Sequence, residues 1–351
     1  MRLGLDLTPV INGDTGVARY ARELHRALTA GHPGVEVRGF AIGRGTETDL
    51  PLHRRVRTPL RVIHRTWQHL GWPPAERLVG PVDVVHSIDM VPPPTRRPLL
   101  MTVHDVLPLC RPELYGPRYR AIAERHARAA ARAAAIVTTC AGTADDISAV
   151  TAIPRHRIHV APPGRRRPGP GGPAVVSGPY VLYVGAITPR KGLHHLAAAM
   201  AAPPDAPPLV VAGPDGWEAD VVRHAIDDLS SPPRITWLGR VSDASLETLL
   251  RHATVLAHPS EAEGFGIPCL EAMGYGVPVV AGDIPPIREL GGDAVVLVAP
   301  GDPGAWRAAL ERVLGDAGLR ADMATVGRRR AAPYTWEAMT DRIVEVYRSV
   351  L

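Results

Sequence analysis

The residues best suited to chemistry are two glutamates, Glu263 and Glu271, which stand eight residues apart around a glycine-rich turn. Carboxylates in such positions bind hydroxyl groups through hydrogen bonds. The free N–H groups of a loop that opens into a helix bind anions, and the positive end of the helix dipole favours them as well. A site that offers both carboxylates and free N–H groups suits a ligand with hydroxyls and phosphates, such as a sugar nucleotide.

The elements around this turn indicate how it is held. The run Val255–His258 is typical of a short buried strand, and it stops at Pro259. Pro268 suits the first turn of a helix, where its missing N–H costs nothing. Glu263 is therefore predicted on a strand-to-helix loop, and Glu271 about one turn into the helix.

The stretch 263–271 resembles the paired-glutamate signature of the retaining GT-B glycosyltransferases of family GT4, a family with mannosyltransferase-like members (glycosyl transferases group 1). The resemblance implies that Glu263 lies by the donor sugar as a catalytic residue and that Glu271 hydrogen-bonds the ribose of the nucleotide. It also places Gly264, Phe265, Gly266 and Leu270 in the donor site. Without the resemblance, two glutamates alone would favour an acidic surface loop.

The composition bounds the class of protein. The chain has 351 residues, of which 45% are hydrophobic and 21% charged, and this suits two globular domains. No apolar run approaches the ~18 residues that cross a bilayer. An Asp inside the apolar N-terminal stretch argues against a signal peptide. The cysteines form no C-x-x-C pair and leave an odd count, so we expect isolated thiols in a reducing cytoplasm.

Short apolar runs alternate with helix-like segments, which favours a parallel α/β architecture. The Pro- and Gly-rich stretch Pro162–Pro173 interrupts the alternation and cannot hold a helix or a central strand. The predicted strands are Leu3–Thr8, Val35–Ile42, Val82–His86, Leu99–His104, Ala135–Thr139, Arg157–Ala161, Tyr180–Val184, Leu209–Ala212, Ile235–Leu238, Thr254–His258, Val279–Ala281 and Ala294–Val298.

We therefore expect an α/β protein of the GT-B type, with two Rossmann-like doubly wound parallel-sheet domains facing a cleft. The expected parts are an N-terminal acceptor-binding domain (1–163), a Pro/Gly/Arg-rich linker (164–178) and a C-terminal nucleotide-sugar-binding domain (179–333). The last segment (334–351) has apolar positions at helical spacing. In the family such a helix crosses back onto the N-terminal domain.

A second candidate for phosphate binding follows the strand Tyr180–Val184. Arg190 and Lys191 supply two cations beside a predicted helix start, and Lys191 is the only lysine in the chain. Lysine and arginine are not interchangeable at a tight phosphate contact. In GT4 enzymes a basic pair in this loop neutralises the diphosphate, and the backbone near Val241 brackets the nucleobase. Solvated cations and an ordinary capped helix start are the alternative interpretations.

Candidates in the N-terminal half lie at predicted strand ends, where open α/β sheets bind ligands. His104 and Asp105 end one strand, and the family's cleft histidine contacts the sugar or supports the departing charge, so His104 is a catalytic candidate. His86 ends another strand and is an acceptor-side candidate together with Asp105. Gly16 lies in a glycine-containing loop that faces the donor in GT4 enzymes. Each of these residues also has a purely structural interpretation.

Two arginine-rich stretches raise the question of other partners. Arg54, Arg55, Arg57, Arg61 and Arg65 alternate with apolar residues, and a second basic strip runs from Arg118 to Arg132. A basic amphipathic helix can lie on an anionic membrane. A solvated face over a core, with Trp67 packed inward, is favoured over such peripheral contact with the inner membrane face. Nucleic acid is not expected, because aromatic stacking platforms are missing.

The sequence thus predicts a hexosyltransferase that uses a nucleoside diphosphate sugar, with GDP-mannose favoured and UDP- or dTDP-hexose as alternatives. The acceptor is a hydroxyl of a glycan, a lipid-linked saccharide or a secondary metabolite. The chain contains no D-x-D motif, so we expect no metal and no cofactor, with phosphate charge met by Arg190, Lys191 and helix dipoles. A GT-B epimerase and a catalytically silent GT-B partner protein are the rival hypotheses.

Overall fold

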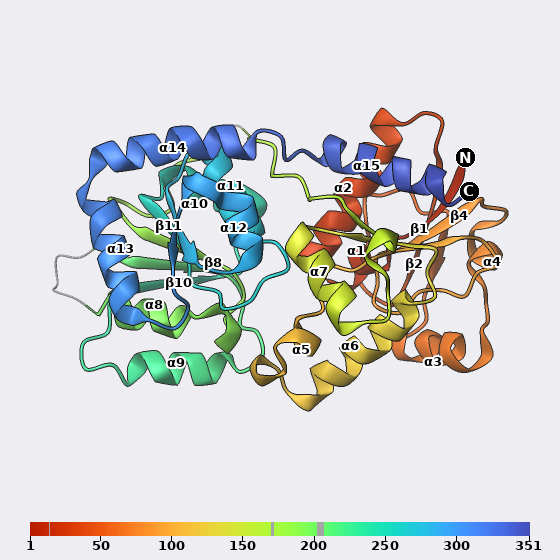
Figure 1. Ribbon diagram of the computed structural model, residues 1–351, viewed down its shortest axis with the longest axis horizontal. Helices are drawn as coiled ribbons and strands as arrows, with labels where there is room; N and C mark the ends of the chain where they lie inside the picture. The colour runs from red at the N-terminus through yellow and green to blue at the C-terminus, as the bar shows by residue number, and fades with distance from the viewer. Residues whose placement is uncertain (14, 170–171, 202–206) are drawn as a thin grey trace. The chain divides into compact units, whose positions relative to one another are not determined.

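The computed structural model describes residues 1–13, 15–169, 172–201 and 207–351 (Figure 1). The chain forms two compact units, which are treated separately below. The N-terminal unit comprises Met1–Gly164 and Tyr334–Leu351, and the C-terminal unit comprises Arg165–Pro333. The linker predicted at 164–178 includes residues 170–171, which lie outside the described residues.

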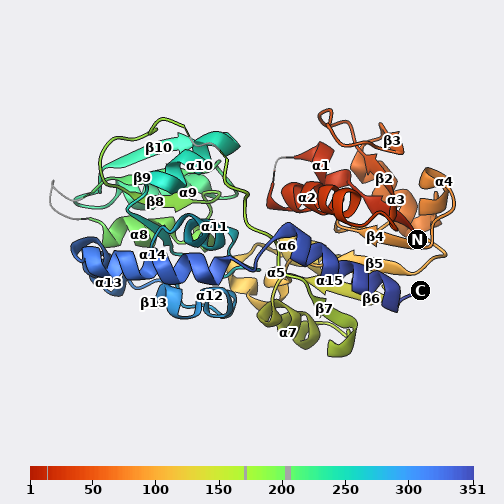
Figure 2. The ribbon, with the colours of Figure 1, turned by 90° about the horizontal axis from the view of Figure 1, so that it is seen from above.

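The N-terminal unit is built on a parallel sheet of seven strands in the order β3-β2-β1-β4-β5-β6-β7. Helices lie on both faces of this sheet (Figure 2). The strands are β1 (Arg2–Asp6), β2 (Glu36–Ile42), β3 (Arg54–Val56), β4 (Val84–Ser87), β5 (Leu99–Thr102), β6 (Ala135–Thr138) and β7 (Ile158–Val160). The helices are α1 (Thr8–Asn12), α2 (Gly16–Gly31), α3 (Leu60–Leu70), α4 (Ala75–Val79), α5 (Leu107–Cys110), α6 (Pro117–Ala130), α7 (Ala141–Val150) and α15 (Trp336–Ser349).

The C-terminal unit has a parallel sheet of six strands in the order β10-β9-β8-β11-β12-β13. Its strands are β8 (Val181–Val184), β9 (Leu209–Ala212), β10 (Ile235–Gly239), β11 (Val255–His258), β12 (Val279–Gly282) and β13 (Val295–Val298). Its helices are α8 (Leu193–Ala199), α9 (Ala219–Asp227), α10 (Asp243–His252), α11 (Ile267–Tyr275), α12 (Pro285–Gly291), α13 (Pro303–Gly315) and α14 (Ala317–Ala331). The prediction of two Rossmann-like parallel-sheet domains is confirmed.

All of the predicted strands are present with small changes at their ends, because most of them are apolar runs that the fold buries. The exception is the edge strand β10, whose residues are exposed or half-buried. The sequence did not predict β3, a three-residue strand of Arg54, Arg55 and Val56. A basic amphipathic helix was considered for this arginine-rich region, and the helix present there, α3, begins only at Leu60. As an edge strand beside β2, β3 needs no alternating apolar pattern.

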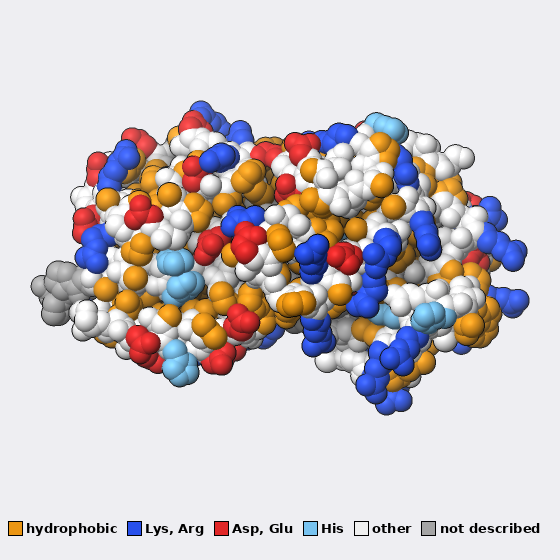
Figure 3. Space-filling model, turned by 60° about the horizontal axis from the view of Figure 1, so that its bottom comes forward, with side chains coloured by type: hydrophobic (Ala, Val, Ile, Leu, Met, Phe, Trp, Pro, Cys, Tyr) orange, Lys and Arg blue, Asp and Glu red, His pale blue; other side chains and the backbone are white. Residues whose placement is uncertain are grey.

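The helix α3 presents the basic face that the arginine pattern predicted. Ile63 and Trp67 are buried, each with 7% of its surface exposed, whereas Arg61 and Arg65 are exposed. On the face of the molecule drawn in Figure 3, arginine side chains (blue) gather over the N-terminal unit. Within the described residues, no helix has both the length and the apolar character needed to cross a membrane.

The C-terminal helix α15 belongs to the core of the N-terminal unit. Thr335 caps it by accepting a hydrogen bond from the backbone N–H of Ala338. Its residues Trp336, Met339 and Ile343 are buried in the same apolar cluster as β1 and α2. After forming the C-terminal unit, the chain therefore returns to the N-terminal unit, where α15 completes the apolar core.

A buried polar chain crosses this core and joins α15 to the sheet. The hydroxyl of Tyr347 lies 2.7 Å from Nδ1 of His86, and Nε2 of His86 lies 2.8 Å from the hydroxyl of Thr102. All three side chains are buried. Burial, followed by the charge of nearby His104, lowers the pKa of His86 to about 3, so its ring is neutral at pH 7.

We predict that Tyr347→Phe lowers the free energy of unfolding by about 1–3 kcal/mol, since it leaves a buried imidazole nitrogen without its partner. Urea denaturation of the full chain, compared between wild type and variant, measures the change in the free energy of unfolding. Tyr119→Phe, at a tyrosine with 38% of its surface exposed, is the control and should be near neutral. Equal stability of Tyr347→Phe and wild type would show that the hydroxyl contact does not hold α15 in place.

Candidate active site

The sheet of the C-terminal unit reverses its strand order between β8 and β11. From β8 the chain proceeds outward to β9 and β10, and from β11 it proceeds outward in the opposite direction to β12 and β13. In open α/β sheets the loops at the carboxyl ends of two such strands diverge and leave a crevice for ligands. The loops after β8 and β11 carry Lys191 and Glu263, so the predicted phosphate and sugar residues share this position.

Four charged or titratable side chains converge there. Lys191 Nζ donates a short hydrogen bond to Glu263 Oε1, and Arg190 Nη1 lies 3.7 Å from Glu263 Oε2. His258, the last residue of β11, places Nε2 at 3.2 Å from Glu263 Oε1. The side chains of Glu263, Lys191 and Arg190 are 10%, 14% and 18% exposed, which leaves the cluster partly reachable from solvent.

Backbone contacts hold the two loops against each other. The carbonyl of Arg190 accepts a hydrogen bond from the N–H of Glu261 at 3.0 Å, and its guanidinium donates to the carbonyl of Ala262 at 2.5 Å. Gly192 has a φ of +65°, and a Cβ at this position would lie 2.3 Å from the carbonyl oxygen of Pro259. Only glycine allows the two loops to approach so closely.

The electrostatics of the cluster favour an ionised Glu263. Burial raises the pKa of this carboxyl, but Lys191 and Arg190 outweigh burial and hold the pKa well below its usual value. Burial lowers the pKa of His258, with the charge of Glu263 acting against that shift. At pH 7 the cluster therefore consists of one carboxylate, two cations and a neutral imidazole.

The turn between the two glutamates is fixed by packing. Gly266 has a φ of +103° and caps α11, and a Cβ there would lie 2.4 Å from Cδ1 of Ile287. Phe265 and Leu270 are buried, with 6% and 0% of their surfaces exposed. These two predicted donor residues therefore belong to the wall behind the turn, and Gly264 connects that wall to Glu263.

Glu271 lies in α11 and is buried, with 3% of its surface exposed. Its Oε1 is 3.5 Å from Nε of Arg166, a residue that sequence analysis treated only as part of the linker. Val241 is half-buried and directly precedes Ser242, whose hydroxyl caps α10. The capped helix start that was considered as an alternative for Val241 is thus present, and its role at a nucleobase stays a prediction.

The predicted residues of the N-terminal unit occupy different environments. His104 follows β5 and stacks edge-on against Tyr20, with ring centroids 4.9 Å apart. Burial, followed by His126, lowers the pKa of His104 to about 4. Asp105 accepts a hydrogen bond from the N–H of Leu107. Gly16 is exposed as the first residue of α2, where Thr15 provides the cap.

His86 was predicted at a strand end, but β4 continues to Ser87. Alternation along the strand turns His86 into the core, where it is fully buried and both ring nitrogens contact hydroxyls. This placement fits a structural role and offers no face to an acceptor.

Sequence analysis missed a polar group at the order reversal of the first sheet, between β1 and β4. Asp6 is fully buried, and it accepts hydrogen bonds from the N–H of Thr8 at 3.0 Å and from the hydroxyl of Ser87 at 3.2 Å. Burial, followed by the charge of Asp89, raises the pKa of Asp6 to about 7. The signal was an aspartate inside an otherwise apolar strand.

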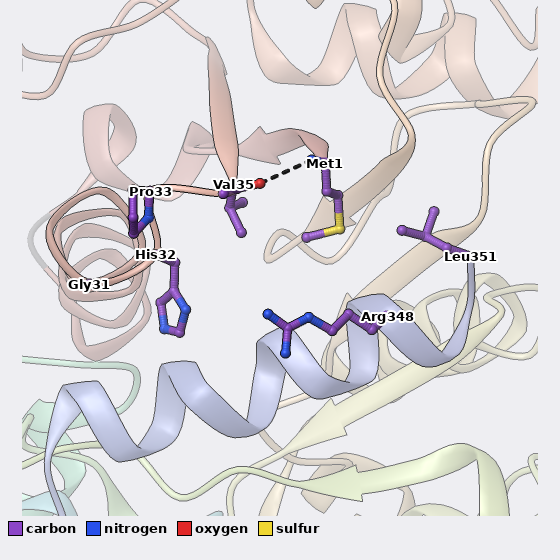
Figure 4. Close-up of a pocket in the computed structure, with 8 residues that line it drawn as sticks. Met1, Gly31, His32, Pro33, Val35, Arg348 and Leu351 are labelled. Atoms are coloured by element: carbon purple, nitrogen blue, oxygen red, sulfur yellow. Dashed lines mark hydrogen bonds between the residues drawn. The ribbon is translucent and has the colours of Figure 1, made fainter.

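A separate hollow of about 320 Å³ lies at the amino ends of β1 and β2, beside α15 (Figure 4). His32 and Arg348 point into it, and Met1 and Val35 form its wall. It is at the edge of the sheet opposite to the carboxyl ends of the strands. None of the predicted site residues lines it.

Two profiles of known protein families match the sequence of this chain. The family profile described as Glycosyltransferase Family 4 matches residues 15–165, and the profile described as Glycosyl transferases group 1 matches residues 173–330. Between them the two profiles account for most of both units. The second profile contains the cluster around Glu263 and Lys191.

Among curated proteins, the O-antigen chain mannosyltransferase B of Escherichia coli is 34% identical over 173 residues, which are 48% of this chain and 45% of that protein. The match thus spans less than half the length of this relative.

Two solved structures share the fold over 99% of the chain. They are sucrose-phosphate synthase from Thermosynechococcus elongatus (TM-score 0.78, 20% identity, 98% of that chain) and Anabaena Alr3699/HepE in complex with UDP-glucose (TM-score 0.74, 16% identity, all of that chain).

The charge cluster gives a prediction for stability. Glu263→Gln should lower the free energy of unfolding by a few kcal/mol at pH 7, because it leaves Lys191 and Arg190 close together without their counter-charge. The folded-state pKa of Glu263 is depressed, so its contribution is complete above the ordinary value of about 4.5 and is lost as the pH falls below it. The difference in free energy of unfolding between wild type and Glu263→Gln should therefore be smaller by roughly 1 kcal/mol at pH 4 than at pH 7.

Urea denaturation of both proteins at pH 7, 5 and 4 measures this gap. A gap that is absent at pH 7, or that widens on acidification, would contradict the ion pairing described for Glu263.

Proposed function

Because the chain belongs to the glycosyl transferases group 1, of the family 4 type with the GT-B fold, we propose that it is a retaining glycosyltransferase that works without a metal ion. It moves a hexose from a nucleoside diphosphate sugar to an acceptor hydroxyl. The observation that carries this proposal is the pairing of Lys191 with Glu263 at the carboxyl ends of β8 and β11.

The pairing matches the two halves of such a donor. A diphosphate brings negative charge that competes with Glu263 for Lys191 and Arg190. Once the cations turn to the phosphates, the Glu263 carboxylate is available to accept hydrogen bonds from the sugar hydroxyls. His258, whose Nε2 lies 3.2 Å from Oε1 in this structure, would restrain the carboxylate. Glu263 thus compensates the charges of Lys191 and Arg190, and the donor diphosphate would take its place.

The reaction exchanges one bond at the anomeric carbon for another. The bond from this carbon to the phosphate oxygen breaks, and a bond to the acceptor oxygen forms on the same face of the sugar. The acceptor proton passes to the departing phosphate oxygen, whose negative charge Lys191 and Arg190 stabilise. Fixed cations that face developing charge in a partly buried site lower the barrier without further reorganisation.

GDP-mannose is the donor that we favour. The support is the named mannosyltransferase relative, together with the Pro189-Arg190-Lys191 loop and the His104-Asp105 pair. UDP- or dTDP-hexose is the alternative, and Anabaena Alr3699/HepE, which shares the fold, was solved with UDP-glucose. The acceptor belongs to the class of glycans, lipid-linked saccharides or secondary metabolites. A GT-B epimerase and a silent partner protein are the rivals.

We predict that the wild-type protein is stabilised by one nucleoside diphosphate out of GDP, UDP, dTDP and ADP, and equally so with Mg²⁺ or with EDTA. A ligand at ~100 times its Kd adds roughly 2.7 kcal/mol to the folded state. Thermal-shift measurements test the panel. A shift with GDP supports the mannosyl donor, and a shift with UDP or dTDP redirects the donor. No shift with any nucleotide would contradict the enzyme proposal.

Two variants separate the roles within the cluster. Lys191→Ala should weaken binding of the same nucleotide by about 10- to 100-fold, because it removes a charge-assisted contact with phosphate. Glu263→Ala should bind the nucleotide no more weakly than wild type, since it frees the cations, but should lose sugar transfer. Arg312→Ala, at an exposed residue of α13, is the control for loss of one cation.

Calorimetric titration and an assay of sugar transfer read out the two effects. Full transfer by Glu263→Ala, or unchanged nucleotide affinity in Lys191→Ala, would refute the assigned roles.

A further inference from the structure

The chain that enters the C-terminal unit lies along α10 and α11. The backbone N–H of Gly169 donates to Oε1 of buried Glu247 at 2.7 Å, and the carbonyl of Gly169 accepts from Arg251 at 2.8 Å. Arg165 runs so close to Gly274 that a Cβ on this glycine would lie 3.0 Å from its Cδ. This stretch of the predicted linker is therefore part of the packed surface of the unit.

Arg166 extends from this stretch between two carboxylates of different elements. Its Nη1 is 2.9 Å from Oδ1 of Asp243, at the start of α10, and its Nε is 3.5 Å from Oε1 of Glu271 in α11. The Arg166 side chain is 11% exposed and that of Glu271 is 3% exposed, whereas that of Asp243 is 82% exposed. The guanidinium thus bridges an exposed and a buried carboxylate.

The neighbouring acidic side chains favour the charged form of Arg166. Burial alone would lower its pKa, but the charge of Glu271 and the hydrogen bond to Asp243 outweigh burial and raise it. Conversely, a guanidinium beside a buried carboxylate offsets much of the cost of removing that carboxylate from water. Arg166 therefore places a positive charge beside the buried Glu271 side chain.

Two buried donors beside Glu271 make no hydrogen bond within the described residues. They are Nε of Arg166 and the hydroxyl of Tyr275, which lies one helical turn after Glu271 in α11. The guanidinium of Arg251 covers the ring of Tyr275, with 5.1 Å between its carbon and the ring centroid. Buried polar groups without partners are uncommon in native proteins and indicate a place where a ligand or water completes the hydrogen bonding.

We propose that Arg166 is a positioning residue for Glu271 and sets the preference of the site for ribose over deoxyribose. This inference rests on the proposed function, together with the role that the family resemblance implies for Glu271, which is to accept hydrogen bonds from the ribose hydroxyls. The rigid fork of Arg166, anchored on Asp243, holds the Glu271 carboxylate in one orientation toward those hydroxyls. A site built to bind a hydroxyl discriminates strongly against a ligand that lacks it, because its buried polar group is then left unpaired.

The test compares nucleotides that differ by one hydroxyl. Wild type, Arg166→Met, Arg166→Lys and the control Arg167→Met are titrated calorimetrically with the nucleoside diphosphate that wild type binds, and with its 2′-deoxy and 3′-deoxy forms. Inorganic pyrophosphate is titrated as well. Arg167 is the exposed neighbour of Arg166, so its variant removes the same charge from the same stretch of chain.

Wild type and Arg167→Met should prefer the ribonucleotide by at least tenfold over one of the deoxy forms. Arg166→Met should lose most of this preference and keep its affinity for pyrophosphate. Arg166→Lys should retain part of the preference, because it restores the charge but not the planar fork. If the Met variant does not fold, the Lys variant carries the test with the same expected direction.

Two results would overturn the inference. Equal weakening of ribo- and deoxynucleotide binding in Arg166→Met, with the ratio preserved, would show that Arg166 only tethers the chain to α10. If Arg166→Lys binds every ligand as wild type does, with the same ratio of ribonucleotide to deoxynucleotide affinity, the inference is likewise overturned. Failure of wild type to bind any nucleoside diphosphate is a distinct outcome, which removes the proposed function and this inference with it.

Discussion

A buried carboxylate that needs cations on both of its oxygens is the constraint on which the C-terminal unit depends. Glu263 is compensated by Lys191 and Arg190, which come from a different strand end. The loops after β8 and β11 must therefore meet, and the glycine at 192 allows them to do so. The same charges that hold these two loops together are those that a diphosphate and a sugar would use. Stability and binding thus depend on one set of contacts.

Unlike Glu263 in the C-terminal unit, the buried polar groups among the described residues of the N-terminal unit are not held by ion pairs. Its buried histidines at 86 and 104 have pKa values lowered by burial, and they take part in hydrogen bonds and ring contacts as neutral groups. Asp6, at the order reversal of the sheet, has its pKa raised to about 7 by burial and by Asp89. The C-terminal unit therefore concentrates cations after β8 and β11, whereas the N-terminal unit holds neutral histidines and an aspartate whose pKa is raised to about 7.

The sequence predicted those features that a local pattern specifies. Buried parallel strands are continuous apolar runs, and the turn before Glu271 carries its own glycines and proline, so both could be recognised. The edge strand β3 was not predicted, because its three residues, two of them arginine, show no pattern typical of a strand. His86 was taken for a strand end because a polar residue follows an apolar run there, but β4 continues to Ser87 and the His86 side chain is buried. Arg166 was missed because its partners, Asp243 and Glu271, are distant in sequence and only the folded chain brings them together. His258 is close to Glu263 in sequence, but it was treated only as the last residue of a strand.

The most direct test of the account is the crystal structure of wild-type protein with the nucleoside diphosphate that it binds. The account predicts the diphosphate between the loops after β8 and β11, with a phosphate oxygen within hydrogen-bonding distance of Lys191 Nζ. It also predicts that Lys191 has separated from Glu263 and that the ribose lies against Glu271. A nucleotide bound elsewhere, with the Lys191–Glu263 pair unchanged, would contradict the assignment of this cluster as the donor site.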